Sequence, residues 1–409
     1  MKPSHAILML LIAASSAAIA QAVAGVTSRV GAMALPVSGT LRYDLRYSQT
    51  SQFGYGQDDR QWSTASGDAS YANAGKHFPF SMQYGGGYGW VWNGPSSPGN
   101  IFQDLSLTQG ISGRAWNLSA SDSVYYSFQT QASSFSGSTS AADQTVLAVN
   151  TRTLDNTATL GIGYKLDYAW SLNVGVSSGQ MRFIDGNGQD MNTVMANGGI
   201  TRRLNARDSA SGQYSFSRYS YSGASAEASA ASVRYSQSNS AQFSLNHQWN
   251  RQISTGASFG PQWVSSSNSA VIPSSTRISA SASFSDILRF GTASLFYSHG
   301  ITGGAGYMLG AETDDAGGNF ARAIGRRLSI TANGSYTRTA GLIGGYSTST
   351  KYGGAQATWR LGRYCNTFAS YTAADQSSSL DNSASILNGL DQSISFGIGY
   401  SPREVHLSK

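Results

Sequence analysis

Residues Thr157–Ser177 read TATLGIGYKL (157–166), DYA (167–169) and WSLNVGVS (170–177), and the fold can be inferred from them. Every second residue of each arm is apolar: Ala158, Leu160, Ile162, Tyr164 and Leu166 in the first arm, and Trp170, Leu172, Val174 and Val176 in the second. Successive side chains of a β-strand point to opposite faces, so each arm has one apolar face and one face of mostly Ser, Thr, Gly and Asn. The short connection predicts an antiparallel hairpin.

The composition separates the chain from soluble domains and from disordered chains. Of its 409 residues 12% are charged, about half of the ~25% usual in soluble domains, and the formal net charge is +6. The 22 Tyr, 16 Phe and 8 Trp exclude a disordered polar chain, which would be poor in aromatic residues. Nucleic-acid binding is not expected, because the basic residues are scattered over many hairpins instead of forming one patch.

The N-terminus has the features of a secretory signal peptide. Lys2 supplies the positive charge, Ala6–Ala20 the apolar core, and Ala18–Ala20 or Ala22–Ala24 a small-x-small cleavage site. An uncleaved anchor is the alternative, but the apolar run is shorter than the ~20 residues of a membrane helix. We expect Sec-type export and this division of the chain: 1–24 signal peptide, 25–38 short leader, 39–400 barrel and 401–409 C-terminal tail.

The rest of the chain repeats the hairpin pattern, with connections of two kinds. Short connections are expected at Leu118–Asp122, Asp167–Ala169, Asn205–Arg207, Asn250–Gln252, Leu288–Arg289, Arg326–Arg327 and Gly362–Tyr364. Long ones, rich in Ser, Gly and Asn, are expected at Trp90–Gly99, Ser133–Asp143, Ser222–Glu227, Ser265–Ser275, Gly341–Thr350 and Gln376–Leu390. The segment Thr313–Phe320, with Gly317 and Gly318, is either a strand with a bulge or a loop.

The alternation of short and long connections is typical of a transmembrane β-barrel. Strands of ~9–11 residues are long enough to cross a bilayer when tilted. Aromatic residues fall near strand ends, where the bilayer interfaces are expected: Tyr125, Tyr126, Tyr219, Tyr221, Trp249, Trp263, Tyr297 and Tyr371. The predicted fold is therefore all-β, a single antiparallel up-and-down barrel of about 18 strands (16–18), in preference to a secreted sandwich or a β-helix.

As a pattern over Gly39–Tyr400, the chain resembles Gram-negative outer-membrane β-barrel proteins of porin-like size. Its last strand, Ile394–Tyr400, is similar to the C-terminal strand that such proteins present to the barrel-assembly machinery, although Ser401–Lys409 follow it. The resemblance implies an outer-membrane location and short turns that face the periplasm. Those turns are basic: Lys76, Arg114, Lys165, Arg202, Arg203, Arg207, Arg251, Arg289, Arg326, Arg327, Arg360 and Arg363. They either attract anionic lipid head groups or snorkel at strand ends without a lipid preference.

No catalytic, cofactor or metal site is predicted. Gly175–Gly179 matches G-x-S-x-G but lies on a strand, whereas a nucleophile elbow needs a strand-to-helix turn. The loop Asp185–Asp190 has Asp190 where a calcium loop needs Gly, and Ala196 where it needs Glu, so an Asn-Gly turn explains it better. Cys365 has no partner for an internal disulfide, and we expect it to be a strand residue.

Charges on the polar faces of strands are the candidate functional residues. They are Arg42, Asp44 and Arg46 in the first strand and Glu312 and Asp314 in a late one, all expected to face the lumen, where charges tune permeant ions. Pairing of these charges with one another, which would only fill the interior, is the alternative.

The sequence thus predicts a porin-like passive channel for small hydrophilic solutes. A non-conducting barrel with an export or structural role is the second hypothesis. The third is a barrel enzyme, with His299 as its only candidate residue. The sequence leaves the oligomeric state open.

Overall fold

The computed structural model describes residues 39–54, 57–73, 75, 77–93, 100–129, 151–184, 190–222, 233–304, 310–343, 345, 347–379 and 389–407. The predicted signal peptide and leader, and Lys76, lie outside these ranges. No helix in the described part is long and apolar enough to cross a membrane.

Within the described residues the chain forms eighteen long strands and one short one. They are β1 (Gly39–Gly54), β2 (Gln57–Asn73), β3 (Phe80–Asn93), β4 (Asn100–Ser112), β5 (Trp116–Gln129), β6 (Thr151–Lys165), β7 (Trp170–Phe183), β8 (Asp190–Arg203), β9 (Asp208–Ser222), β10 (Tyr235–Gln248), β11 (Ile253–Ser266), β12 (Ser275–Leu288), β13 (Gly291–Thr302), β14 (Ala311–Ile324), β15 (Leu328–Gly341), β16 (Ser347–Arg360), β17 (Cys365–Ser378), β18 (Gly389–Tyr400) and β19 (Val405–Leu407).

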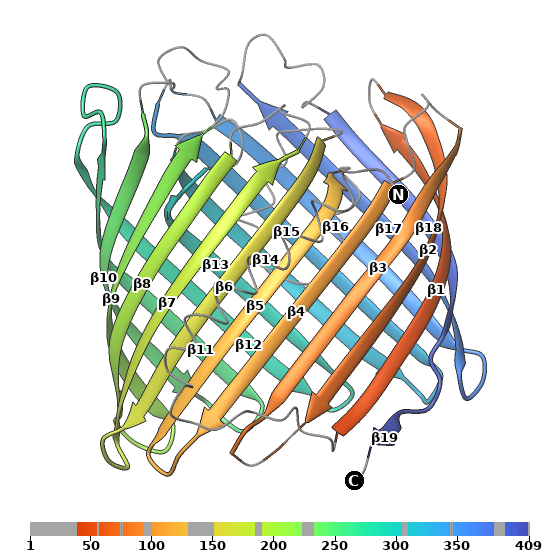
Figure 1. Ribbon diagram of the computed structural model, residues 1–409, viewed down its shortest axis with the longest axis horizontal. Coiled ribbons are helices and arrows are strands. Elements are labelled where there is room, and N and C mark those ends of the chain that lie inside the picture. The colour runs from red at the N-terminus through yellow and green to blue at the C-terminus, as the bar shows by residue number, and fades with distance from the viewer. Residues whose placement is uncertain are drawn as a thin grey trace, which may run out of the picture.

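The long strands form one closed cylinder. Each pairs antiparallel with the next, and β18 pairs with β1 from Leu45 opposite Tyr400 to Gly54 opposite Asp391. Figure 1 shows the strands tilted around the cylinder, with the short turns at the lower end and the longer connections at the upper end. Closure leaves no unpaired sheet edge, which is the condition for a sheet to lie in hydrocarbon. The predicted all-β up-and-down barrel of about 18 strands is confirmed.

Contacts between distant strands identify the inner face. Tyr221 on β9 donates a 2.8 Å hydrogen bond to the carbonyl oxygen of Gly303, which follows β13, and such a contact can only cross the interior of the cylinder. Met191 lies directly opposite Tyr221 and Met181 directly opposite Met191, so this face continues from strand to strand. The inner face so traced is mostly Ser, Thr, Gly, Asn and Gln.

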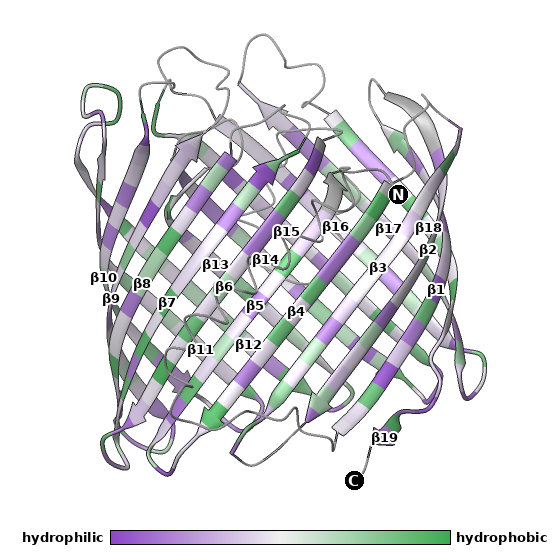
Figure 2. Ribbon diagram, in the orientation of Figure 1, coloured by the Kyte–Doolittle hydropathy of each residue, from purple (hydrophilic) through white to green (hydrophobic). Residues whose placement is uncertain are grey.

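The other face is apolar and therefore points outward. On it Leu160 lies opposite Val176, which lies opposite Ala196, whereas Thr159 and Ser177 form the adjacent inner pair. Leu160 and Val176 are 45% and 48% exposed although both are apolar. Figure 2 shows the resulting alternation of hydrophobic and hydrophilic positions along the strands. The prediction for Thr157–Ser177 is confirmed, with β6 and β7 as the two arms of a hairpin.

The connections alternate in length as predicted, with local differences. Short turns occupy 113–115, 166–169, 204–207, 249–252, 289–290, 325–327 and 361–364. The turn predicted at Leu118–Asp122 is wrong, because these residues lie inside β5 and the turn comes earlier, at 113–115. Thr313–Phe320 is neither bulge nor loop but regular β14, paired without a shift to both neighbours. The small residues Gly317 and Gly318 therefore lie within a continuous ladder.

The residues after the last barrel strand return to the closing seam. Tyr400 is the last residue of β18 that pairs with β1, and β19 then pairs with Gly39–Leu41 at the start of β1. An ion pair of 2.6 Å joins Glu404 to Arg42 beside this short ladder. The tail thus extends the β1–β18 seam at the short-turn end of the barrel.

Candidate functional site

The lumen wall is made chiefly of hydroxyl and amide side chains that hydrogen-bond to one another across neighbouring strands. The directly paired hydroxyls include Ser121 with Thr159 (2.6 Å), Ser215 with Ser240 (2.7 Å), Ser258 with Ser281 (2.7 Å), Thr372 with Ser393 (2.6 Å) and Thr50 with Ser395 (2.8 Å). These short side chains satisfy one another's hydrogen bonds along the wall. Such a surface offers hydrogen bonds to a solute without a strong electric field.

Arg42, Asp44 and Arg46 lie on the inner face of β1. They alternate with Tyr43, Leu45 and Tyr47, which are exposed and apolar on the outer face. Arg42 forms an ion pair with Glu404 of the tail. Asp44 and Arg46 form no ion pair with any described residue.

Two further carboxylates extend this charged region and were not found from the sequence. Asp68 on β2 lies directly opposite Asp44, and Asp104 on β4 lies across Gly85 of β3. A Cβ atom built on Gly85 would lie 2.7 Å from a carboxylate oxygen of Asp68 and closer still to a carboxylate oxygen of Asp104. Both carboxylates therefore lie directly above the glycine. We call Asp44, Asp68 and Asp104 the acidic row. Only the strand register brings them together, which is why the sequence pattern did not reveal the row.

Asp314 does not face the lumen, and the expectation that it does is wrong. The lumen-facing position expected of Glu312, which lies directly opposite the buried Ile301, stays a prediction. Asp314 lies directly opposite His299, on the outer face of β13 and β14 that also carries exposed Leu295 and Phe320. Next to Asp314 this outer face also carries Tyr297, so it is polar here. Alternation alone could not assign the faces of β14, because both are polar here.

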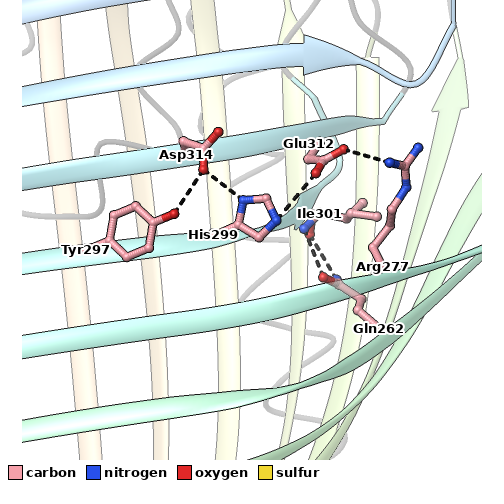
Figure 3. Close-up of polar contacts among 7 residues, drawn as sticks. All are labelled: Gln262, Arg277, Tyr297, His299, Ile301, Glu312 and Asp314. Atoms are coloured by element: carbon pink, nitrogen blue, oxygen red, sulfur yellow. Dashed lines mark hydrogen bonds and ion pairs between the residues drawn. The ribbon is translucent and has the colours of Figure 1, made fainter.

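Figure 3 shows the network that Glu312 and Asp314 form with their neighbours. The Tyr297 hydroxyl donates to Asp314 at 3.2 Å, and His299 lies between Asp314 (Nδ1, 2.8 Å) and Glu312 (Nε2, 3.4 Å). Arg277 of β12 reaches Glu312 at 3.4 Å. Both ring nitrogens of His299 thus face carboxylates, and neither contacts a described serine that could serve as a nucleophile.

In the same region a side chain bridges a gap in the backbone hydrogen bonding between β12 and β13. The ladder between β12 and β13 ends at Ala280 opposite His299, so Ile301 has no backbone partner on β12. Gln262 of β11 supplies the missing partners, since its Oε1 accepts from the Ile301 N–H at 3.0 Å and its Nε2 donates to the Ile301 carbonyl at 3.4 Å (Figure 3). The side chain of Gln262 is buried, as this role requires.

Apolar residues gather inside the long-loop end. Val233, Val264, Ile272 and Ile301 are buried together, and Tyr221, Val271, Leu342 and Ile343 pack against them. We call these eight residues the mouth cluster. Gly303 lies against the rings and side chains of Tyr219 and Met191 on the inner wall, where a Cβ atom would collide with both. Of the aromatic residues that the sequence placed near the bilayer interfaces, Tyr219 and Tyr221 instead face this mouth, and Tyr125, directly opposite Asp104, faces inward. Tyr126, Trp263, Tyr297 and Tyr371 face outward.

The remaining motifs carry no site. Ser177 lies in the middle of β7 with Gly175 and Gly179, in an extended strand and not at a nucleophile elbow. Of the loop Asp185–Asp190 only Asp190 is described, and it accepts hydrogen bonds from Arg182 (3.0 Å) and the Phe183 N–H (2.9 Å). In the described part of the chain, no three His, Cys, Asp or Glu side chains are placed to hold a metal ion.

Comparisons with known proteins describe the architecture only. No protein-family model matches the sequence, and no curated protein matches it. Among solved structures, OccK2 (OpdF) of Pseudomonas aeruginosa is 12% identical with a TM-score of 0.48, over 89% of this chain and 98% of that one. OpdK of P. aeruginosa with vanillate is 11% identical with a TM-score of 0.47, over 89% and 99%. The FrpB iron transporter of Neisseria meningitidis (F3-3 variant) is 7% identical with a TM-score of 0.45, over 89% and 81%. At these values no solute or mechanism is transferred to this chain.

Proposed function

We propose that the chain is a passive channel of a Gram-negative outer membrane that conducts small hydrophilic solutes. The observation that carries the proposal is the distribution of side chains around a closed wall, which is the reverse of that in a soluble protein. Exposed Leu, Ile, Val and aromatic side chains lie outside, and paired hydroxyls and amides lie inside. Such a surface is stable when its outside meets acyl chains and its inside meets water. A barrel of about 16–18 strands is wide enough for an aqueous channel unless loops fill it.

The lumen chemistry supports weak selectivity. Hydroxyl and amide groups can replace the hydration of an uncharged polar solute, and they favour neither sign of charge. The acidic row is the exception, because Asp44, Asp68 and Asp104 place three carboxylates on one part of the wall with Arg46 as the nearby unpaired base. Rings of charge at a pore bias it toward counter-ions. We therefore propose a modest preference for cations over anions.

Two features support the proposed orientation in the membrane. The short-turn end carries Arg114, Arg202, Arg207, Arg251, Arg289, Arg326 and Arg363 near its turns, together with the two chain ends of the barrel. Three of these guanidinium groups lie over aromatic rings, Arg202 over Trp170 (5.0 Å), Arg289 over Phe290 (5.0 Å) and Arg363 over Tyr364 (5.5 Å). Cationic and aromatic side chains at one level are typical of the interface between acyl chains and anionic head groups. This end would face the periplasm, and outer-membrane lipid and the barrel-assembly machinery would be the partners during insertion.

The mouth cluster favours one alternative, a barrel whose lumen is occluded and whose role lies in export or envelope structure. Its buried apolar side chains hold several long connections together inside the wall. Liposome swelling distinguishes the two roles. Vesicles that contain the purified full-length chain and are diluted into isotonic sugars or amino acids should swell at rates that fall as the solute grows. Folded protein that gives no swelling with the smallest solutes would favour the occluded barrel and reject the channel.

A further inference from the structure

One ionisable side chain interrupts the apolar outer face in the middle of a strand. Asp122 on β5 shares the outer face with Leu118 and Val124, and its cross-strand partners are Leu107 of β4 and Ala158 of β6. It lies between Trp116 and Tyr126, which mark the two aromatic ends of this face on β5. A carboxylate at this depth would face acyl chains. Ionisable residues within the membrane are costly and normally have a partner.

The described residues satisfy only part of Asp122. Nδ2 of Asn156 donates to Oδ1 of Asp122 at 2.9 Å and also lies 3.4 Å from the carbonyl oxygen of Ser123. No described residue donates to the second carboxylate oxygen. The second carboxylate oxygen of Asp122 is therefore a hydrogen-bond acceptor without a donor among the described residues. Acyl chains contain no hydrogen-bond donor that could satisfy it.

The missing donor is present on the same outer face, two strands away. Tyr84 of β3 is 43% exposed, and its hydroxyl forms no hydrogen bond with a described residue. β3 and β5 flank β4 on its two sides. Leu105 of β4 lies directly opposite Tyr84, and Leu107, the next outward residue of β4, lies directly opposite Asp122.

We propose that the outer face of β3, β4 and β5 binds a second copy of this chain about a two-fold axis that runs along the membrane normal past β4. Rotation about this axis sets β4 against β4 and exchanges β3 with β5. The Tyr84 hydroxyl of each copy then donates to Asp122 of the other copy, which gives two equivalent hydrogen bonds across the interface. A self-complementary patch of this kind is what an isologous dimer requires. Leu105 of the two copies would meet near the axis.

A single cysteine near the axis tests the proposal. Native Cys365 is replaced by serine, and Leu105→Cys is introduced into the full-length chain, which is reconstituted in vesicles and oxidised. The matched control is Leu295→Cys, on the outer face of β13 and 60% exposed. The Leu105 variant should form a disulfide-linked dimer roughly tenfold faster than the control, and Tyr84→Phe or Asp122→Leu should each slow this by roughly tenfold, as the loss of hydrogen bonds between copies predicts.

Two results would overturn the proposal. One is equal cross-linking of the Leu105 and Leu295 variants. The other is cross-linking of the Leu105 variant that is unchanged by both Tyr84→Phe and Asp122→Leu. Heat-dependent gel mobility reports whether each barrel is folded, and Tyr84→Phe serves as the deciding variant if Asp122→Leu fails to fold. Swelling rates with small sugars should be the same in all these variants, because every changed residue lies on the outer face.

Discussion

Asp44 on β1 and Asp68 on β2 lie directly opposite each other on the inner face, and neither forms an ion pair with a described residue. Like charges in directly opposite positions destabilise a pair of strands unless water and ions screen them. A wall that carries this pair, with Asp104 beyond Gly85, is therefore best explained by a hydrated lumen. The acidic row also makes the proposed channel function testable with few substitutions.

Replacement of Asp68 and Asp104 by Asn together should reduce the cation preference. The double variant keeps the size of both side chains and removes two negative charges from the wall, so the reversal potential in a KCl gradient should move toward the anion side. Bilayer recordings of wild type and variant measure this shift. Asp314→Asn is the matched control, because Asp314 lies on the outer face and its replacement should leave the reversal potential unchanged. A shift in the control but not in the double variant would contradict the assignment of faces.

Gly85→Val should narrow the lumen beside the acidic row. A Cβ atom at this position would collide with the carboxylates of Asp68 and Asp104, so these side chains must move toward the channel axis. The expected result is a lower single-channel conductance, with a stability loss of about 1–3 kcal/mol from overpacking. Gly198→Val, on the outer face with no atom within 4 Å of its Cβ position, is the control and should retain wild-type conductance.

Loss of the Tyr221 hydroxyl should loosen the mouth cluster. Tyr221→Phe removes the hydrogen bonds to the Gly303 carbonyl (2.8 Å) and to Ser236 (2.9 Å), a loss of about 1 kcal/mol each. We expect noisier open-channel current or a higher conductance. Tyr214→Phe, which loses a 2.8 Å hydrogen bond to Asn239 on the outer face, controls for the loss of a phenol hydroxyl. Identical current noise in wild type and both variants would mean that the cluster does not restrict the lumen.

The tail should stabilise the closing seam mainly through its backbone. Glu404→Gln removes an exposed ion pair with Arg42 and should cost less than about 1 kcal/mol. Removal of residues 402–409 should cost more, because Gly39–Leu41 then lose their hydrogen-bonded partner β19. The temperature at which the folded band disappears in gel electrophoresis measures both effects. A larger loss for Glu404→Gln than for the truncation would contradict this division.

Local periodicity was sufficient to predict the barrel, because the fold needs only strands with one apolar face and turns between them. β6 and β7 show this most clearly: Leu160, Ile162 and Val174 alternate with Ser, Thr and Gly, and only a membrane outside makes both faces stable. The strand count followed from the number of such segments.

What could not be predicted depends on register and on contacts between distant strands. The outward face of Asp314 follows from its partner His299, not from the polar pattern of β14. The acidic row joins three strands, and the mouth cluster joins residues from three strands and three connections. Contacts between residues that are distant in the sequence cannot be predicted from a local pattern. The turn at Leu118–Asp122 was mispredicted because Asp122 was taken for a turn residue, although it is an outer-face residue of β5.

Recording of single channels from the purified full-length chain in a planar lipid bilayer tests whether the barrel conducts. If the hydroxyl-lined interior is a water-filled passage, folded protein should produce discrete, nearly ohmic conductance steps that persist without any added ligand. If protein that is folded, as judged by heat-dependent gel mobility, inserts into the bilayer and still produces no steps, the lumen is closed and this barrel is not a diffusion channel.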